Sequence, residues 1–181
     1  MFPSAWPLFA VIAIGLLLAV GWLLHTRSIG SEQKWLPKEL RDAELVYAEK
    51  VFRSGGTMPI VAKCDRGYRT KKGVIILVEL KTRRVNRTYL SDVIELSAQR
   101  FSIQMQNGEN VAEYGYVLVQ RPGGKSKYLH RVKLLLPEEI LALARRREVI
   151  LTDIASAATT CSKGLCQKCA YCRECHSQET S

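Results

Sequence analysis

A run of apolar residues that ends in an acid and a base most constrains the fold of this 181-residue chain. The segment "VIILVELKTR" begins with 74–78, all apolar, and continues with Glu79, Leu80 and Lys81. An unbroken run rich in Val and Ile is typical of a strand buried on both faces of a sheet. Side chains alternate along a strand, so Glu79 and Lys81 are expected on one face and Leu80 on the other. The segment therefore predicts a central strand that ends in a polar site.

The segments on either side of this strand predict an α/β domain around a small mixed sheet. The apolar spacing at 88–106 indicates a helix that packs through Leu90, Ile94 and Phe101, with Val93 beside them. The other expected helices run from Pro37 to about Phe52 and from Pro137 onward, and the expected strands cover 60–68, 74–81, 114–120 and 127–136.

A second carboxylate is expected near Glu79. Asp65 lies in the preceding strand, and a turn near 70–72 brings it close to Glu79 in the paired strand. Two carboxylates repel each other unless a cation lies between them, and hard oxygen ligands suit Mg²⁺ or Mn²⁺. Lys81 would then orient or deprotonate a water molecule, or stabilise charge on a phosphate. The alternative is a surface ion pair between Glu79 and Lys81, since Glu-x-Lys is a common pattern.

Together these residues resemble the signature of the PD-(D/E)xK nuclease superfamily, and more narrowly its RecB-like branch. Asp65 is followed after thirteen residues by Glu79-Leu80-Lys81, on consecutive expected strands. "VELKTR", a helix carrying "SDVIELSAQRF" and the strand "YGYVLV" match the layout of that branch from about Glu44 to Cys175. The resemblance implies a restriction-endonuclease-like core, with a central mixed sheet flanked by helices, and an Mg²⁺- or Mn²⁺-dependent DNA nuclease.

The resemblance also implies roles for individual residues. Lys81 would be catalytic, and Glu49 is the alternative to Glu44 as the acid supplied by the first helix. The implied metal ligands are Asp65, Glu79, the backbone carbonyl of Leu80 and Glu44.

An auxiliary motif of the family, Gln-x-x-x-Tyr on a helix, corresponds here to Glu95 and Gln99. These two residues lie one helical turn apart and share a face. The chain departs from the family pattern at both, and also at Cys64, where a proline usually precedes the aspartate. The departures affect the auxiliary motif more than the metal site, because Asp65, Glu79 and Lys81 are all present.

The chain is basic, with 27 Lys and Arg against 17 Asp and Glu and a formal net charge of +10. A basic surface attracts nucleic acid through counterion release, but it also favours solubility and contact with anionic lipid. Charge alone does not choose between these partners. The residues expected to follow a DNA backbone are Arg83, Arg84, Arg87, Lys71 and Lys72, with a solvated charged loop as the alternative.

The N-terminal segment predicts a membrane anchor. Ala5–Leu24 is 20 residues long without a charge, enough to span a bilayer core of about 30 Å. A secretory signal peptide is the competing interpretation, but no Lys or Arg precedes the run. Arg27 and Lys34 follow it, so the positive-inside rule predicts a single-pass protein with its N-terminus outside and its catalytic domain in the cytoplasm. The expected organisation is an anchor at 1–27, a linker at 28–36, a nuclease domain at 37–158 and a tail at 159–181.

Five of the six cysteines lie in the tail, which predicts a metal or iron–sulfur site. Cys-x2-Cys-x5-Cys after a RecB-like core is similar to the CRISPR-associated iron–sulfur exonuclease family, which implies a 4Fe-4S cluster. Zinc is the alternative, because four local thiolates suit a tetrahedral site. The expected ligands are Cys161, Cys166, Cys169, Cys172 and Cys175.

Two functions compete with the nuclease. One is a catalytically inactive protein that binds nucleic acid at the membrane. The other is a metal or redox sensor that uses the cysteine tail.

Overall fold

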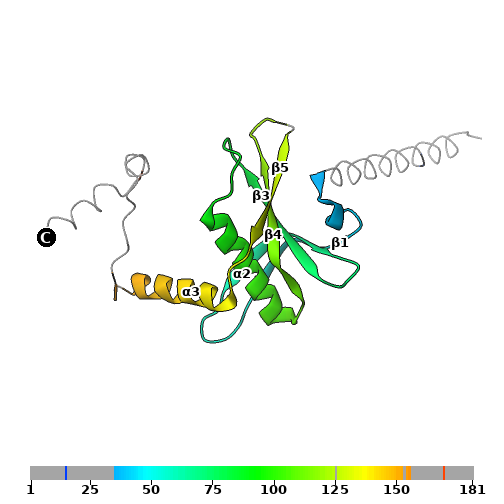
Figure 1. Cartoon of the computed structure of the whole chain (residues 1–181). Coiled ribbons are helices and arrows are strands. Elements are labelled where there is room, and N and C mark those ends of the chain that lie inside the picture. Colours follow the sequence, from blue (N-terminus) through cyan, green and yellow to red (C-terminus); the bar gives the residue numbers. More distant parts are fainter. Residues whose placement is uncertain (1–14, 16–34, 125, 153, 156–168, 170–181) are drawn as a thin grey trace, which may run out of the picture. The chain divides into compact units, whose positions relative to one another are not determined.

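The computed structural model describes residues 35–124, 126–152 and 154–155, and the single residues Gly15 and Cys169. Within them it has one five-stranded sheet and two α-helices (Figure 1), which confirms the α/β class. The sheet and α2 belong to a compact unit that ends at Ile140, and the rest of α3 belongs to a second unit. The elements are η2, a 3₁₀ turn (Lys38–Leu40), β1 (Glu44–Arg53), β2 (Val61–Arg69), β3 (Ile75–Thr82), α2 (Leu90–Asn107), β4 (Val111–Gln120), β5 (Lys127–Lys133) and α3 (Pro137–Leu151).

The strands lie in the order in which they occur in the chain, from β1 to β5. Every neighbouring pair is antiparallel except β3 and β4, which are parallel. Parallel neighbours need a crossover between them, and α2 provides it. This topology makes β3 the central strand of a mixed sheet, as predicted.

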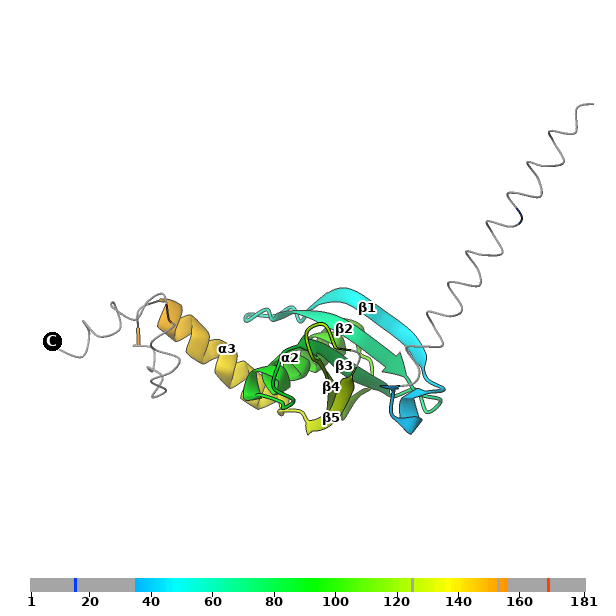
Figure 2. The same ribbon diagram turned by 90° about the horizontal axis from the view of Figure 1, so that it is seen from above.

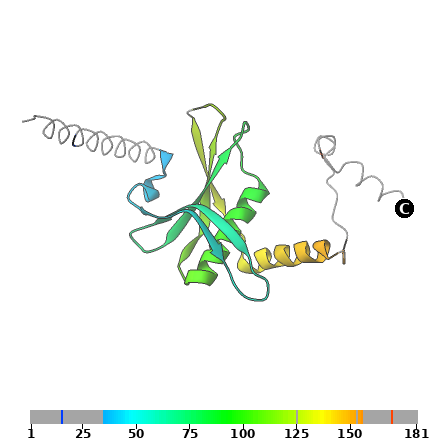
Figure 3. The same cartoon turned by 180° about the vertical axis from the view of Figure 1, so that it is seen from behind.

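Both faces of the central strand are covered. On one face Leu96 and Ile103 of α2 are fully buried and pack with Leu77. On the other face Leu40 packs with Ile76 beneath the segment that precedes β1. Figure 2 shows α2 beside the strands, and Figure 3 shows the β1–β2 hairpin from behind. We call the α2 side the helix face of the sheet.

The expected helix from Pro37 to Phe52 is wrong. Only Lys38–Leu40 is helical, as a 3₁₀ turn, and Glu44–Arg53 is strand β1. The strand lacks the usual alternation because Tyr47 and Phe52, five residues apart, pack on the same face with ring centroids 4.8 Å apart. An irregularity lies between them at Glu49, whose φ is +51°. Because of that break the apolar residues of β1 do not alternate with a period of two, and their spacing resembles that of a helix.

The second expected helix is present, but it packs through a different stripe. Leu90 is 68% exposed, and the residues that face the sheet follow a spacing of four, three and four. They are Asp92, Leu96, Gln99 and Ile103, all at most 2% exposed. Two of these four are polar. The helix therefore carries partners for buried polar groups as well as apolar contacts.

Close packing of β4 under α2 requires a glycine. A Cβ atom on Gly115 would lie 3.0 Å from the carbonyl oxygen of Leu77 and 3.5 Å from the side chain of Leu96. The first contact is with backbone, so it cannot be relieved by a change of rotamer. Gly115 thus allows β3, β4 and α2 to approach one another.

No helix in the described ranges is long and apolar enough to cross a bilayer. The anchor expected at Ala5–Leu24 lies outside the described residues, apart from Gly15.

Truncating the buried leucine of α2 tests this packing. We expect Leu96→Ala to lower the free energy of unfolding by about 2–5 kcal/mol, because it leaves a cavity between α2 and β3. Leu90→Ala, in the same helix but exposed, should change it by less than about 0.5 kcal/mol. Urea denaturation of the full chain measures both. Equal losses in the two variants would contradict the assignment of the packed stripe.

Candidate active site at the end of β3

The candidate site lies where β2 separates from β3. The pairing of these strands ends at Arg66 and Val78, so the next residues along, Asp65 and Glu79, stand opposite each other just beyond it. In a regular strand, residues three apart lie on opposite faces. Cys64 and Gly67 are three apart, yet both lie on the helix face of the sheet. The alternation of β2 is therefore broken at Asp65, opposite the break at Glu49 in β1. This paired irregularity lets Asp65 lean toward the end of β3.

Asp65 is fixed by the backbone of β3. Its Oδ2 accepts a hydrogen bond of 2.9 Å from the backbone N–H of Leu80. That bond spans the separating strands and takes the place of a missing ladder bond. The carboxyl group is thereby held beside the end of β3, next to Glu79.

Glu79 is the most deeply buried acid of this site, with 2% exposure. Both of its carboxylate oxygens have partners. Oε2 accepts a hydrogen bond of 2.7 Å from Nε2 of Gln99, which is fully buried in α2. Oε1 forms an ion pair of 2.8 Å with the ammonium group of Lys81. A buried carboxylate needs such partners, because an isolated charge is very costly away from water.

Lys81 bridges two acids. Its Nζ lies 2.8 Å from Oε1 of Glu79 and 2.6 Å from Oε2 of Glu95 on α2. The lysine side chain is 27% exposed and that of Glu95 is 47% exposed. Four sequence-predicted residues, Glu79, Lys81, Glu95 and Gln99, thus form one connected network, and Asp65 adjoins it.

The electrostatics of the pair follow from burial. Burial raises the pKa of Glu79 from 4.5 to about 7, against the hydrogen bonds from Lys81 and Gln99, which lower it. Burial also opposes the charge on Lys81, but its hydrogen bonds to Glu79 and Glu95 outweigh that effect and raise its pKa above the usual value. A neutral Glu79 would leave Lys81 with Glu95 alone. The upward shift in the pKa of Glu79 follows from its burial, and Lys81 keeps the exposed Glu95 as a partner whether Glu79 is charged or neutral.

The donor set suits a hard divalent cation, although it is small. In the described parts of the chain, no three His, Cys, Asp or Glu side chains are grouped closely enough to hold a metal ion. The site offers the carboxylates of Asp65 and Glu79, which are oxygen donors of the kind that Mg²⁺ prefers alongside water. Oε1 of Gln99 is buried and accepts no hydrogen bond within the described structure.

Two groups of predicted site residues do not join this set. Glu44, expected on a first helix, is instead the first residue of β1 and pairs with Arg69, well along the hairpin from Asp65. It is therefore not placed as a third metal ligand. Lys71 and Lys72 lie in the β2–β3 turn, at the opposite end of β3 from Glu79, and Lys71 forms an exposed ion pair with Asp42.

Glu49, the alternative acid, forms an exposed ion pair with Lys63 of the neighbouring strand. It lies at the irregular point of β1, opposite Asp65. No described contact joins its carboxylate to Glu79 or Lys81.

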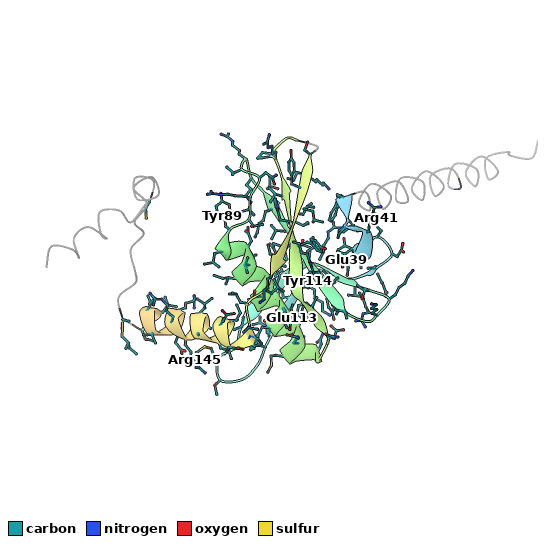
Figure 4. The ribbon with its side chains drawn as sticks, in the orientation of Figure 1. Glu39, Arg41, Tyr89, Glu113, Tyr114 and Arg145 are labelled. Carbon is teal, nitrogen blue, oxygen red and sulfur yellow. The ribbon has the colours of Figure 1, made fainter. Side chains whose placement is uncertain are left out.

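The basic loop after β3 is close to the site and is held in place. The guanidinium group of Arg83 forms an ion pair of 2.6 Å with the buried carboxylate of Asp92 in α2, so this arginine has a structural role. Arg83 and Arg87 both stack on the ring of Tyr89, at 4.7 Å and 4.5 Å from its centroid; Figure 4 labels this tyrosine. Arg84 and Arg87 are exposed, which leaves them as the loop cations available to a ligand.

Sequence reasoning missed the residues that fix this loop. Asp92 accepts hydrogen bonds from Arg83 and from the backbone N–H of Tyr89, and Asn86 pairs with His130 of β5 at 2.7 Å. An acid in the first turn of the helix, five residues after the last loop arginine, is the one signal that pointed to such a contact.

Most of the cysteine tail lies outside the described residues. Cys169 is described and is exposed. Cys64 is buried in the core, where burial raises the pKa of its thiol to about 12. It stays neutral and is a poor metal ligand. The other expected ligands, Cys161, Cys166, Cys172 and Cys175, are not described.

The raised pKa of Glu79 predicts a pH-dependent stability in the absence of divalent cations. The folded state binds this proton more tightly than the unfolded state, so the stabilisation is complete below pH 4.5 and is lost as the pH rises through about 7. At about 1.4 kcal/mol per pKa unit, the loss is on the order of 3 kcal/mol. Glu79→Gln cannot titrate here, so the stability difference between variant and wild type should grow in the variant's favour between pH 4.5 and 7.5. Urea denaturation in EDTA measures it, and parallel curves would contradict the shift.

Comparison with known proteins adds little to this geometry. No protein-family model matches the chain, and no curated protein matches it. Among solved structures, the crystal structure of a protein called SSO0001 is similar, with a TM-score of 0.49 and 16% sequence identity over 92% of this chain and 76% of that one.

Proposed function

We propose that this chain is a divalent-metal-dependent DNA nuclease of the PD-(D/E)xK type, with a restriction-endonuclease-like core. The observation that carries the proposal is the ion pair of Glu79 and Lys81 where β2 separates from β3, beside the Asp65 carboxylate that binds the backbone N–H of Leu80. The central position of β3 and the α2 crossover to a parallel β4 agree with the layout that the resemblance implies.

Asp65, Glu79 and the backbone carbonyl of Leu80 would hold Mg²⁺ or Mn²⁺. Such an ion supplies polarisation of a phosphate and a lower pKa for bound water. The oxygen-only donor set supports this assignment.

Lys81 would act as a cation rather than as a base. Its two acidic partners favour the ammonium form, so at neutral pH it remains protonated. A positive charge beside the reacting phosphate stabilises the negative charge that develops during hydrolysis. Gln99 would hold Glu79 in position, since it donates to one carboxylate oxygen from a fully buried site.

DNA would approach along the loop that follows β3. Arg84 and Arg87 are exposed there, next to the strand end that carries Lys81. Contacts of these side chains with phosphates would position a strand without reading its sequence. The net charge of +10 supports a polyanionic partner.

The two ends of the chain complete the proposal. Residues 5–24 would anchor the domain in a bilayer, with the nuclease on the cytoplasmic side. The cysteine tail would hold a 4Fe-4S cluster or, alternatively, a structural Zn²⁺. Iron and sulfide analysis of anaerobically purified protein distinguishes these two groups.

Removing the lysine tests the activity. We expect Lys81→Ala to lower cleavage of single- or double-stranded DNA in Mg²⁺ or Mn²⁺ by about 10²-fold or more, because the transition state loses a stabilising positive charge. Lys133→Ala, an exposed lysine of β5 at the other end of the sheet, should cleave like the wild type. A wild type without activity on either substrate would overturn the proposal and favour a protein that only binds nucleic acid.

A further inference from the structure

The ammonium group of Lys81 occupies the position at which a cation would meet Glu79. Its Nζ lies 2.8 Å from Oε1 of Glu79, a distance typical of a direct charge-assisted contact. Among the described residues, Lys81 is the one base that forms an ion pair with this acid. The other oxygen of Glu79 is occupied by Gln99. A metal ion that binds Oε1 of Glu79 meets the positive charge of this ammonium group, so the two cations compete electrostatically for the carboxylate.

Lys81 is the partner that can leave. Gln99 is fully buried and has no second described partner for its Nε2 group. Lys81, in contrast, is 27% exposed and already contacts a second acid, Glu95, at 2.6 Å. Moving the ammonium from Glu79 toward Glu95 keeps it paired. Glu95 is 47% exposed, so the relocated charge would remain in contact with water.

We propose that Lys81 is an internal counter-ion that competes with divalent cations for Glu79, and that Glu95 is a positioning residue that receives its ammonium group when the metal binds. This inference rests on the proposed function, because it requires a metal site at Asp65 and Glu79. It assigns a role to an acid that stands where the family pattern has glutamine.

The spacing on α2 supports this division of roles. Glu95 and Gln99 lie one helical turn apart on the same side of α2, and both reach the end of β3. Gln99 is neutral and holds Glu79, whereas Glu95 is charged and holds Lys81. In Glu95→Gln the side chain would still accept a hydrogen bond from the ammonium group of Lys81, but it would not neutralise the positive charge of that group.

The competition predicts opposite effects of two substitutions on metal affinity. Lys81→Met removes the competing charge, so the full chain should bind Mn²⁺ roughly tenfold more tightly. Glu95→Gln leaves Lys81 with Glu79 as its one acidic partner, so it should weaken Mn²⁺ binding by roughly threefold or more. Electron paramagnetic resonance of free Mn²⁺ measures both affinities directly, without DNA and without turnover.

A double-mutant cycle separates the positioning role from direct ligation. If Glu95 acts through Lys81, then Glu95→Gln should have no effect on Mn²⁺ affinity when Lys81 is already Met. If Glu95 is itself a ligand, its effect will persist in that background, which would overturn the inference. Lys133→Met removes the same charge at the other end of the sheet and should leave the affinity unchanged.

Asp65→Asn distinguishes failure of the inference from failure of the metal site. Wild-type binding that Asp65→Asn abolishes supports the site. If the wild type binds no Mn²⁺, or binds it equally well as Asp65→Asn, the proposed function and the inference fail together. If binding depends on Asp65 but Lys81→Met does not tighten it, only the inference fails. Circular dichroism checks that Lys81→Met folds. If it does not, the Mn²⁺ affinity of Glu95→Gln tests the inference by itself, and an affinity equal to that of the wild type would overturn it.

Discussion

The burial of one carboxylate, that of Glu79, sets the requirements that the rest of this fold meets. An apolar strand delivers this acid into the space between the sheet and α2, where water is excluded. A charge placed there must be paired and hydrogen-bonded, or it will take up a proton. Lys81 supplies the charge, and Gln99 supplies the hydrogen bond. Gln99 on the buried stripe of α2 thus follows from the acid that the helix covers, whereas Asp92 on the same stripe pairs with Arg83. They cost packing energy that an apolar helix would have gained, which is a common sign of a functional site.

The second requirement is geometric, because Asp65 has to reach the same point from a neighbouring strand. Regular pairing would continue the ladder and use the backbone N–H of Leu80 in a β bond. Instead the strands separate, and the side chain of Asp65 accepts that N–H. The irregularity extends to β1, where Glu49 adopts a left-handed φ that is uncommon for a side-chain-bearing residue. Irregularities of this kind re-aim side chains at the rims of sheets. Here the one in β2 lies at a candidate metal ligand, and the one in β1 lies directly opposite.

The sequence predicted the parts of the site that depend on strand alternation and failed where alternation breaks. Glu79 and Lys81 share a face because β3 is regular, whereas Asp65 reaches the backbone N–H of Leu80 from the break in β2. The same reasoning misassigned β1, because its break at Glu49 erased the period of two. Glu44 was misplaced with it, since its expected role depended on a helix that is not there. Lys71 and Lys72 were grouped with the site by charge alone, and charge carries no information about which end of a hairpin a residue occupies.

The connection between Lys81 and Glu95 shows why contacts between strand and helix are the hardest to predict. Each residue lies in a correctly predicted element, yet their meeting depends on how α2 is rotated against the sheet. The expected stripe of Leu90, Ile94 and Phe101 would have turned the helix differently, and Leu90 is in fact exposed. The buried stripe was not recognised from its apolar residues, because two of its positions, Asp92 and Gln99, are polar. Function and packing therefore compete for the same helix face. The buried acid on β3 is the physical reason for Gln99 at one core-facing position, and Arg83 of the loop after β3 is the reason for Asp92 at another.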